Sequence, residues 1–140
     1  VKIIQLIKAD RKTGELATAA KVGIEVTQMG LGFVPKQSSP AFADHARAAR
    51  AGLAMAREAL FTRSHDIVIL DEVCTAVSLG LIDSSEVVET LNVAGDESIV
   101  VLTGRGAPAE LIELADTVAE MKAVKHAFDA GVKAMKGVEY

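Results

Sequence analysis

The chain has 140 residues, half of them hydrophobic and only 4% aromatic, which is enough for one domain with an aliphatic core. Its formal charge of −4 argues against a dedicated nucleic-acid-binding protein, and its apolar runs fall short of the roughly 18 residues that a membrane span requires. The single cysteine excludes an internal disulfide and is typical of a reducing cytoplasm, so we expect a cytoplasmic protein.

The first part of the chain predicts strands separated by a loop and a short helix. Apolar residues at 1–7 predict a strand, and the polar stretch at 9–15 predicts a loop. Leu16–Lys21 can form a short helix, and the alternating pattern at 23–29 predicts a half-buried strand.

The next segment, 30–35, has two glycines and a proline around Phe33 and predicts an irregular loop. Loops at strand ends carry function in α/β proteins, so this loop is a candidate binding element.

A long helix follows, and Ser39 and Pro40 predict its start, with Ser39 as the N-cap and Pro40 at the first helical position. The helix is predicted to end near Arg63. Its arginines lie off the apolar stripe and are expected to face solvent rather than phosphate. The residues of the stripe, spaced by three and four, are Phe42, Ala46, Ala49, Leu53, Ala56 and Leu60.

Two apolar runs in the second half predict parallel strands that are buried on both faces. The first, Ile67–Leu70, is followed directly by Asp71 and Glu72. The second, Ser98–Leu102, is followed by Thr103, Gly104 and Arg105.

Two further helices accompany these strands. Asp83 and Glu86 have the spacing of a capping box and predict a short helix after them. Pro108 predicts the start of a helix over 109–115 whose inward side chains are Leu111, Ile112 and Leu114. Residues 116–121 predict a short strand or extended piece, and the structure of the tail stays open.

Strands that alternate with helices predict an α/β fold with a mostly parallel sheet flanked by helices. The carboxyl ends of parallel strands meet at one edge, where open α/β sheets bind ligands. Asp71 and Glu72 are therefore candidates for holding Mg²⁺, and Arg105 for contacting phosphate. The alternatives are an acidic surface turn, or an Arg–carboxylate pair that joins two loops.

Other residues refine this expectation. Gly104 and Gly106 favour a binding role because glycine lets a ligand approach the backbone. No phosphate-binding G-x-x-x-x-G-K-[ST] loop occurs in the 140 residues, so the residues alone indicate only part of a nucleotide-handling domain. The histidines lack metal-ligand spacing, although His126 can donate to a ligand or simply lie on the surface. Cys74 is expected to pack in the core.

Taken together, the chain resembles the P-loop-type ATP:corrinoid adenosyltransferases of the bacterial cobalamin pathway. The most specific parts are the Thr-Gly-Arg at 103–105 and the Val-Lys-His-Ala-Phe-Asp-Ala-Gly at 124–131. The segments that carry the resemblance are Gln5–Lys8, Thr13–Glu15, Gly32–Phe33, Leu70–Glu72, Leu102–Gly106, Ala115–Val118, Glu120, Val124–Ala134 and Gly137–Tyr140.

This resemblance implies a P-loop NTPase fold of RecA-like type and transfer of the 5′-deoxyadenosyl group of ATP to a reduced Co(I) corrinoid, with release of triphosphate. It further implies that Asp71 and Glu72 serve Mg²⁺ and that Glu72 and Arg105 act in catalysis.

The resemblance also implies roles around the two substrates. Thr103, Lys125 and His126 would line the binding site. Phe33 would pack beside the corrinoid and help to remove its lower ligand. A homodimer, and a reductase or flavodoxin as electron donor, are implied as partners.

Two departures from the family pattern stand out. Pro35 occupies a position where some relatives carry Trp, so removal of the lower ligand is expected to be poorer or to proceed differently. The family's P-loop lies upstream of the strand that opens this chain, which begins with Val1. We therefore expect residues 1–140 to be one α/β domain, the C-terminal portion of a truncated adenosyltransferase, with weak ATP binding and poor activity alone.

Two other functions remain open from the sequence. One is a non-catalytic corrinoid-binding protein that has lost its P-loop. The other is an ATPase of another P-loop family, in which Leu-Asp-Glu and Thr-Gly-Arg match by chance.

Overall fold

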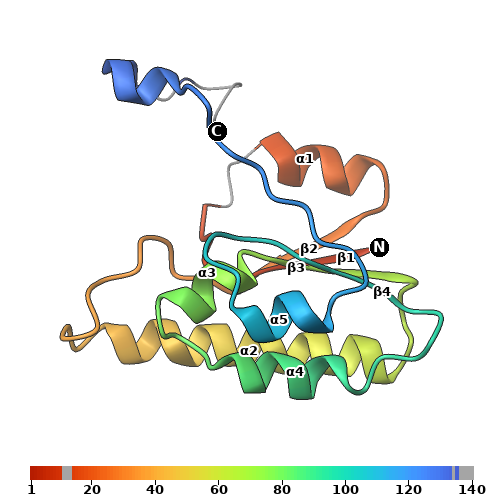
Figure 1. Cartoon of the computed structure of the whole chain (residues 1–140). Coiled ribbons are helices and arrows are strands. Elements are labelled where there is room, and N and C mark those ends of the chain that lie inside the picture. The colour runs from red at the N-terminus through yellow and green to blue at the C-terminus, as the bar shows by residue number, and fades with distance from the viewer. Residues whose placement is uncertain (11–13, 134, 136–140) are drawn as a thin grey trace.

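A parallel sheet forms the centre of the computed structural model, which describes residues 1–10, 14–133 and 135 (Figure 1). The strands lie in the order β2-β1-β3-β4, and each neighbouring pair is parallel. This confirms the predicted α/β class with a parallel sheet. The strands are β1 (Lys2–Gln5), β2 (Glu25–Gln28), β3 (Ile67–Asp71) and β4 (Ile99–Leu102).

Helices lie on both sides of the sheet. In Figure 1, α2, α4 and α5 lie below it and α1 lies above it, while α3 follows β3 at the carboxyl ends of the strands. No described helix is long and apolar enough to cross a membrane. The helices are α1 (Gly14–Lys21), α2 (Phe42–Phe61), α3 (Val73–Ser78), α4 (Ser84–Leu91), α5 (Ala109–Leu114) and a 3-10 turn (Ala127–Ala130).

The long helix α2 buries its predicted stripe but begins differently from the prediction. Phe42 is its first residue and Ala41 its N-cap, without a capping side chain, so the assignment of Ser39 as cap and Pro40 as first helical residue is wrong. Ser39 instead takes part in two successive turns: its N–H donates to Lys36 O and its carbonyl accepts from Phe42 N–H. The second turn thus uses Phe42 N–H, the group that a Ser39 cap would accept.

The core lies between α2 and the lower face of the sheet. Alternate strand residues such as Ile4, Val68 and Leu70 are fully buried there. Gly52 of α2 permits close packing, because a Cβ at this position would lie 2.4 Å from Leu6 Cδ2. Tight packing therefore explains a glycine in the middle of the helix despite its conformational cost.

The expectation that both later strands are buried on two faces is wrong. In β3 only Val68 and Leu70 are buried, and the other positions are intermediate. In β4, Ile99 is 56% and Val101 38% exposed. The reason is position: β4 is the edge of the described sheet, and α1 lies over the opposite edge, beside β2.

The remaining helices agree with the sequence in part. The capping box of α4 is present, with Asp83 and Glu86 in the predicted roles. In α5 only Leu111 is buried, whereas Ile112 and Leu114 are about half exposed, so the prediction that all three point inward is wrong for two. Successive helical residues are about 100° apart, so Ile112 lies off the face that Leu111 buries, and Leu114 is the last residue of α5.

Candidate active site

Polar side chains stand at the carboxyl ends of all four strands. Gln5 pairs in register with Gln28 of β2 and with Asp71 of β3, and Thr103 directly follows β4. We call Gln28, Gln5, Asp71 and Thr103 the polar row. Gln28, Gln5 and Asp71 are each the last residue of their strand. Because the strands are parallel, their ends meet at one edge of the sheet and bring these side chains together.

Asp71 is the centre of the polar row. Thr103 Oγ1 donates to its Oδ1 over 2.9 Å, and Gln5 Nε2 donates to its Oδ2 over 3.0 Å. Lys8 Nζ lies 3.4 Å from the same Oδ2. A carboxylate offers about four lone-pair positions, so these partners leave room for a further contact.

Thr103 joins two strand ends through one hydroxyl. Its Oγ1 accepts the backbone N–H of Glu72 over 2.9 Å while it donates to Asp71. Its carbonyl accepts the N–H of Cys74 over 3.0 Å. Because the N–H can only donate, the hydroxyl proton must point at the carboxylate, and this sets the orientation of Asp71.

Glu72 has a strained backbone. It is the N-cap of α3 with φ 63° and ψ 21°, the left-handed conformation that residues with a side chain rarely adopt. Its N–H is held by Thr103 and its carbonyl accepts from Ala76 N–H. Strain of this kind, about 1–3 kcal/mol, persists where surrounding contacts impose it and is common at functional sites.

The two glutamines of the polar row support Asp71 from the other side. Gln5 is 4% exposed, and its Nε2 also donates to Glu15 Oε1 of α1 over 3.1 Å. Its Oε1 accepts from Gln28 Nε2 over 2.8 Å. The Gln5 NH₂ group must face the two carboxylates, and its oxygen must face the donating amide of Gln28. Only one orientation of the Gln5 amide therefore satisfies all three hydrogen bonds.

Lys8 lies between two carboxylates. Its ammonium is 3.4 Å from Asp71 Oδ2 and 3.3 Å from Glu15 Oε1. Burial lowers the pKa of Lys8, but the attraction of Asp71 and Glu15 outweighs it, and the net pKa lies above its ordinary value. Lys8 is therefore a cation at neutral pH.

Sequence reasoning did not single out four residues of this site: Gln5, Lys8, Glu15 and Gln28. A signal was available, because polar residues end β1 and β2 just as Asp71 ends β3.

Arg105 is exposed beside the polar row. Its N–H donates to Thr75 Oγ1 over 2.9 Å. Among the described residues no carboxylate pairs with its guanidinium, so the alternative of an Arg–carboxylate pair between loops is wrong. Thr103 and Thr75 join these loops instead, and the guanidinium stays accessible.

Gly104 is required by contacts within the protein. Its φ is +131°, and a Cβ would lie 2.7 Å from Thr75 N and 2.8 Å from Thr75 Oγ1. Gly106, at φ +68°, similarly faces Ser78 Cβ at 3.1 Å. The close approach that the sequence suggested for a ligand is thus made by α3 itself.

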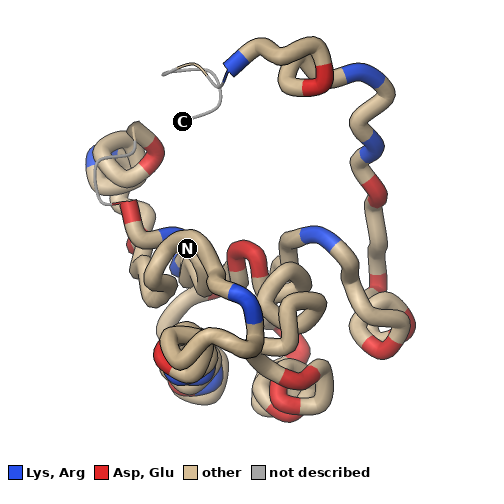
Figure 2. The backbone as a smooth tube through the Cα atoms, turned by 90° about the vertical axis from the view of Figure 1, so that its left-hand side faces the viewer, with Lys and Arg blue, Asp and Glu red and all other residues tan. Residues whose placement is uncertain are grey.

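The other predicted site residues lie outside the polar row. Phe33 is 96% exposed in the loop before α2. Lys125 and His126 are exposed in the tail, which arches away from the sheet and helices in Figure 2, and His126 Nδ1 accepts from Phe128 N–H. Thr13 and the segment 137–140, which contributed to the family resemblance, lie outside the described residues.

The donor types present suit a Mg²⁺ whose coordination shell a nucleotide completes. The described residues contain no group of three His, Cys, Asp or Glu placed to hold a metal ion. Magnesium is commonly held by one or two carboxylates, with substrate phosphates and water completing its shell. The adjacent carboxylates Asp71 and Glu72 match that number, whereas a cage made of protein alone requires more ligands.

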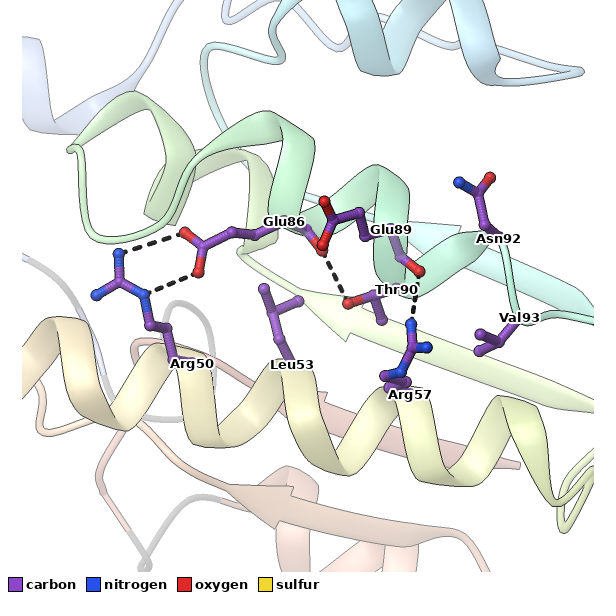
Figure 3. A pocket seen from close by; sticks show the side chains of 8 residues that line it. All are labelled: Arg50, Leu53, Arg57, Glu86, Glu89, Thr90, Asn92 and Val93. Carbon is purple, nitrogen blue, oxygen red and sulfur yellow. Dashed lines mark hydrogen bonds and ion pairs between the residues drawn. The ribbon is translucent and has the colours of Figure 1, made fainter.

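A hollow between α2 and α4 is a different kind of feature (Figure 3). Arg50 makes two contacts with the Glu86 carboxylate, and Arg57 donates to the carbonyl of Glu89 over 2.8 Å. Both arginines thus join the two helices, a structural role that the sequence did not indicate, although the Arg50 side chain remains 52% exposed as a solvent-facing residue would be. Lys and Arg are scattered along the described chain in Figure 2.

Comparison with known proteins finds similarity to one family, both in a family model and in individual curated proteins. The whole chain, residues 1–140, matches the model of the family described as ATP:corrinoid adenosyltransferase BtuR/CobO/CobP. Similar curated proteins named corrinoid adenosyltransferase come from Escherichia coli K12 (39% identical), Salmonella typhimurium (36%) and Pseudomonas aeruginosa (39%). Each similarity covers 100% of this chain and 70%, 70% and 69% of the respective relative.

Proposed function

The chain belongs to the ATP:corrinoid adenosyltransferase family, and from that premise we propose that the polar row and Glu72 form the Mg²⁺ and triphosphate side of its active site. The enzyme transfers an adenosyl group from ATP to a corrinoid. The carboxyl edge of the sheet supports this location, because open α/β sheets bind their ligands there.

In the proposed reaction, Co(I) of the corrinoid attacks C5′ of ATP. Both electrons of the new Co–C bond come from cobalt, the C5′–O bond breaks, and triphosphate leaves with that electron pair. The protein must hold the two substrates in line and stabilise the negative charge on the leaving group.

Asp71 and Glu72 are the proposed Mg²⁺ ligands. Bound Mg²⁺ supplies positive charge next to the phosphate oxygens. Thr103 keeps the Asp71 carboxylate in one orientation, because its hydroxyl accepts from Glu72 N–H and directs its own proton to Asp71 Oδ1. This bridging hydroxyl is the observation that carries the proposal.

The remaining roles follow the family resemblance. Arg105 is exposed two residues after Thr103, and its guanidinium is proposed to face the nucleotide or the corrinoid, with bidentate contact in the case of a phosphate. Phe33 is exposed and is proposed to pack against the corrinoid. Pro35 stands two residues later, where some relatives carry Trp. Lys125 and His126 are proposed to reach the substrates from the tail.

The partners are also proposals. Production of a Co(I) corrinoid requires an electron donor, for which a reductase or flavodoxin is proposed. A homodimer is proposed from the family resemblance.

The test combines the complete protein, of which residues 1–140 are expected to be the C-terminal portion, with ATP, Mg²⁺ and chemically reduced corrinoid and follows the absorption spectrum. Conversion to the adenosylated form is expected, and Asp71→Asn should slow it on the order of 100-fold because a metal ligand is lost. Corrinoid binding without conversion would indicate a non-catalytic binding protein. Steady phosphate release without corrinoid would indicate an ATPase.

A further inference from the structure

We propose that Lys8 is a phosphate-binding residue that pairs with Asp71 in the nucleotide-free protein and transfers to the triphosphate of ATP when a divalent cation binds Asp71. This inference rests on the proposed role of Asp71 as a metal ligand. It assigns a substrate contact to a lysine that lies shortly after β1.

The first step of the argument is the arrangement of charges. Asp71 and Glu15 come from different elements, yet Gln5 Nε2 donates to Asp71 Oδ2 over 3.0 Å and to Glu15 Oε1 over 3.1 Å. Two carboxylates that share one donor repel each other. Lys8, at 3.4 and 3.3 Å from the same two oxygens, supplies the positive charge that offsets this repulsion.

The second step is competition for one oxygen. Asp71 Oδ2 already accepts from Gln5 and faces the Lys8 ammonium. A divalent cation at Asp71 repels that ammonium, so Lys8 and the metal disfavour each other at this carboxylate. Of the two cations, the divalent one interacts more strongly with a carboxylate, and Lys8 is displaced.

The third step is what Lys8 can reach. Its side chain is 42% exposed, so the ammonium has an open path, and the four-carbon stem is flexible. A polyphosphate bound with the metal places several negative oxygens beside Asp71. The Lys8 ammonium therefore leaves the Asp71 carboxylate and pairs with a phosphate oxygen, so its charge remains paired with an anion in both states.

A second lysine provides a matched control. Lys2 lies at the opposite end of the same segment, in β1, and its Nζ is 2.8 Å from Glu25 Oε1. It too is a lysine paired with a glutamate of a neighbouring element. Its partner lies at the amino ends of the strands, away from the polar row.

The experiment measures two affinities for each variant of the complete protein. Binding of Mn²⁺ without nucleotide is followed by electron paramagnetic resonance, and binding of ATP in the presence of Mg²⁺ by titration calorimetry. Lys8→Met should raise the Mn²⁺ affinity roughly threefold, since a competing charge is gone, and lower the ATP affinity on the order of tenfold. Lys8→Arg should retain most of the ATP affinity, and Lys2→Met should change neither value.

Opposite changes of the two affinities distinguish this role from structural support. If Lys8→Met lowers both affinities or leaves ATP binding unchanged, the role of Lys8 is overturned. Asp71→Asn separates this outcome from failure of the proposed site: unchanged Mn²⁺ affinity in that variant contradicts the metal role of Asp71, and with it the displacement of Lys8. Circular dichroism verifies that every variant is folded.

Discussion

Thr103 Oγ1 donates a hydrogen bond to Asp71 Oδ1 over 2.9 Å and thereby joins the end of β4 to the end of β3. The same oxygen accepts the N–H of Glu72. One hydroxyl thus orients the central carboxylate of the polar row and holds the strained residue at the start of α3.

Replacing Thr103 tests this bridge. Thr103→Val keeps the shape of the side chain but leaves Glu72 N–H and Asp71 Oδ1 without their partner, so the free energy of unfolding should fall by about 1–3 kcal/mol and turnover should fall as well. Thr103→Ser retains the hydroxyl and should recover most of both. Urea unfolding and the spectral assay measure the two effects; a fully stable and active valine variant would contradict the bridge.

Glu72 separates stability from function. Glu72→Gln should lower turnover more than it lowers stability, because the carboxylate is the proposed metal ligand while the backbone contacts remain. Glu72→Gly should raise the free energy of unfolding by up to about 1 kcal/mol, since glycine adopts φ 63° without strain, and should still lose turnover.

Arg63 is the control for Glu72, because it also has a positive φ, of 50°, and lies outside the polar row. Arg63→Gly should leave turnover unchanged. Unchanged turnover in Glu72→Gln would remove this carboxylate from the mechanism, and thermal unfolding together with the spectral assay distinguishes the cases.

Gly104 and Gly23 form a matched pair for backbone strain. Both have positive φ, +131° and +74°, but a Cβ added at Gly104 would lie within 3.0 Å of Thr75, whereas one added at Gly23 would have no described atom within 4 Å. Gly23→Ala should cost about 1 kcal/mol of unfolding free energy. Gly104→Ala should cost roughly 2 kcal/mol or more, because the clash is added. Equal losses in denaturant titrations would show that Thr75 yields easily.

Glu86 predicts a pH dependence of stability. Its hydrogen bond with Arg50, opposed by burial, lowers the pKa of Glu86 below its ordinary value of 4.5. The pKa of Glu86 is thus lower in the folded than in the unfolded state. The ion pair therefore stabilises the fold fully above the unfolded-state pKa, and this contribution is lost as the pH falls through the folded-state pKa.

The corresponding measurement compares urea unfolding at pH 7 and pH 3. Glu86→Gln should lose about 0.5 kcal/mol at pH 7, a magnitude suited to a partly exposed pair, and little at pH 3. Glu89→Gln on the same helix is the control, since none of the described ion pairs includes Glu89. A difference that persists undiminished at pH 3 would exclude the ion pair as its cause.

Local patterns in the sequence were sufficient for the elements and for part of the site. The stripe of α2, the capping box at Asp83 and Glu86, and the strands ending at Asp71 and Leu102 all follow from periodicity and short-range hydrogen bonding. The proximity of Asp71 and Thr103 also followed, because parallel strands end at a common edge. The cap at Ser39 failed because Phe42 N–H, which the capping side chain would accept, bonds to the Ser39 carbonyl in a turn instead.

What the sequence by itself determined is the α/β class, the identity of the carboxylates at a strand end and the family. Only the tertiary structure decided which side chains surround those carboxylates and which strand faces stay exposed. Gln5 and Asp71 are 66 positions apart, and they meet because β1 lies between β2 and β3. Strand order is a property of the assembled sheet, so a local pattern cannot specify it.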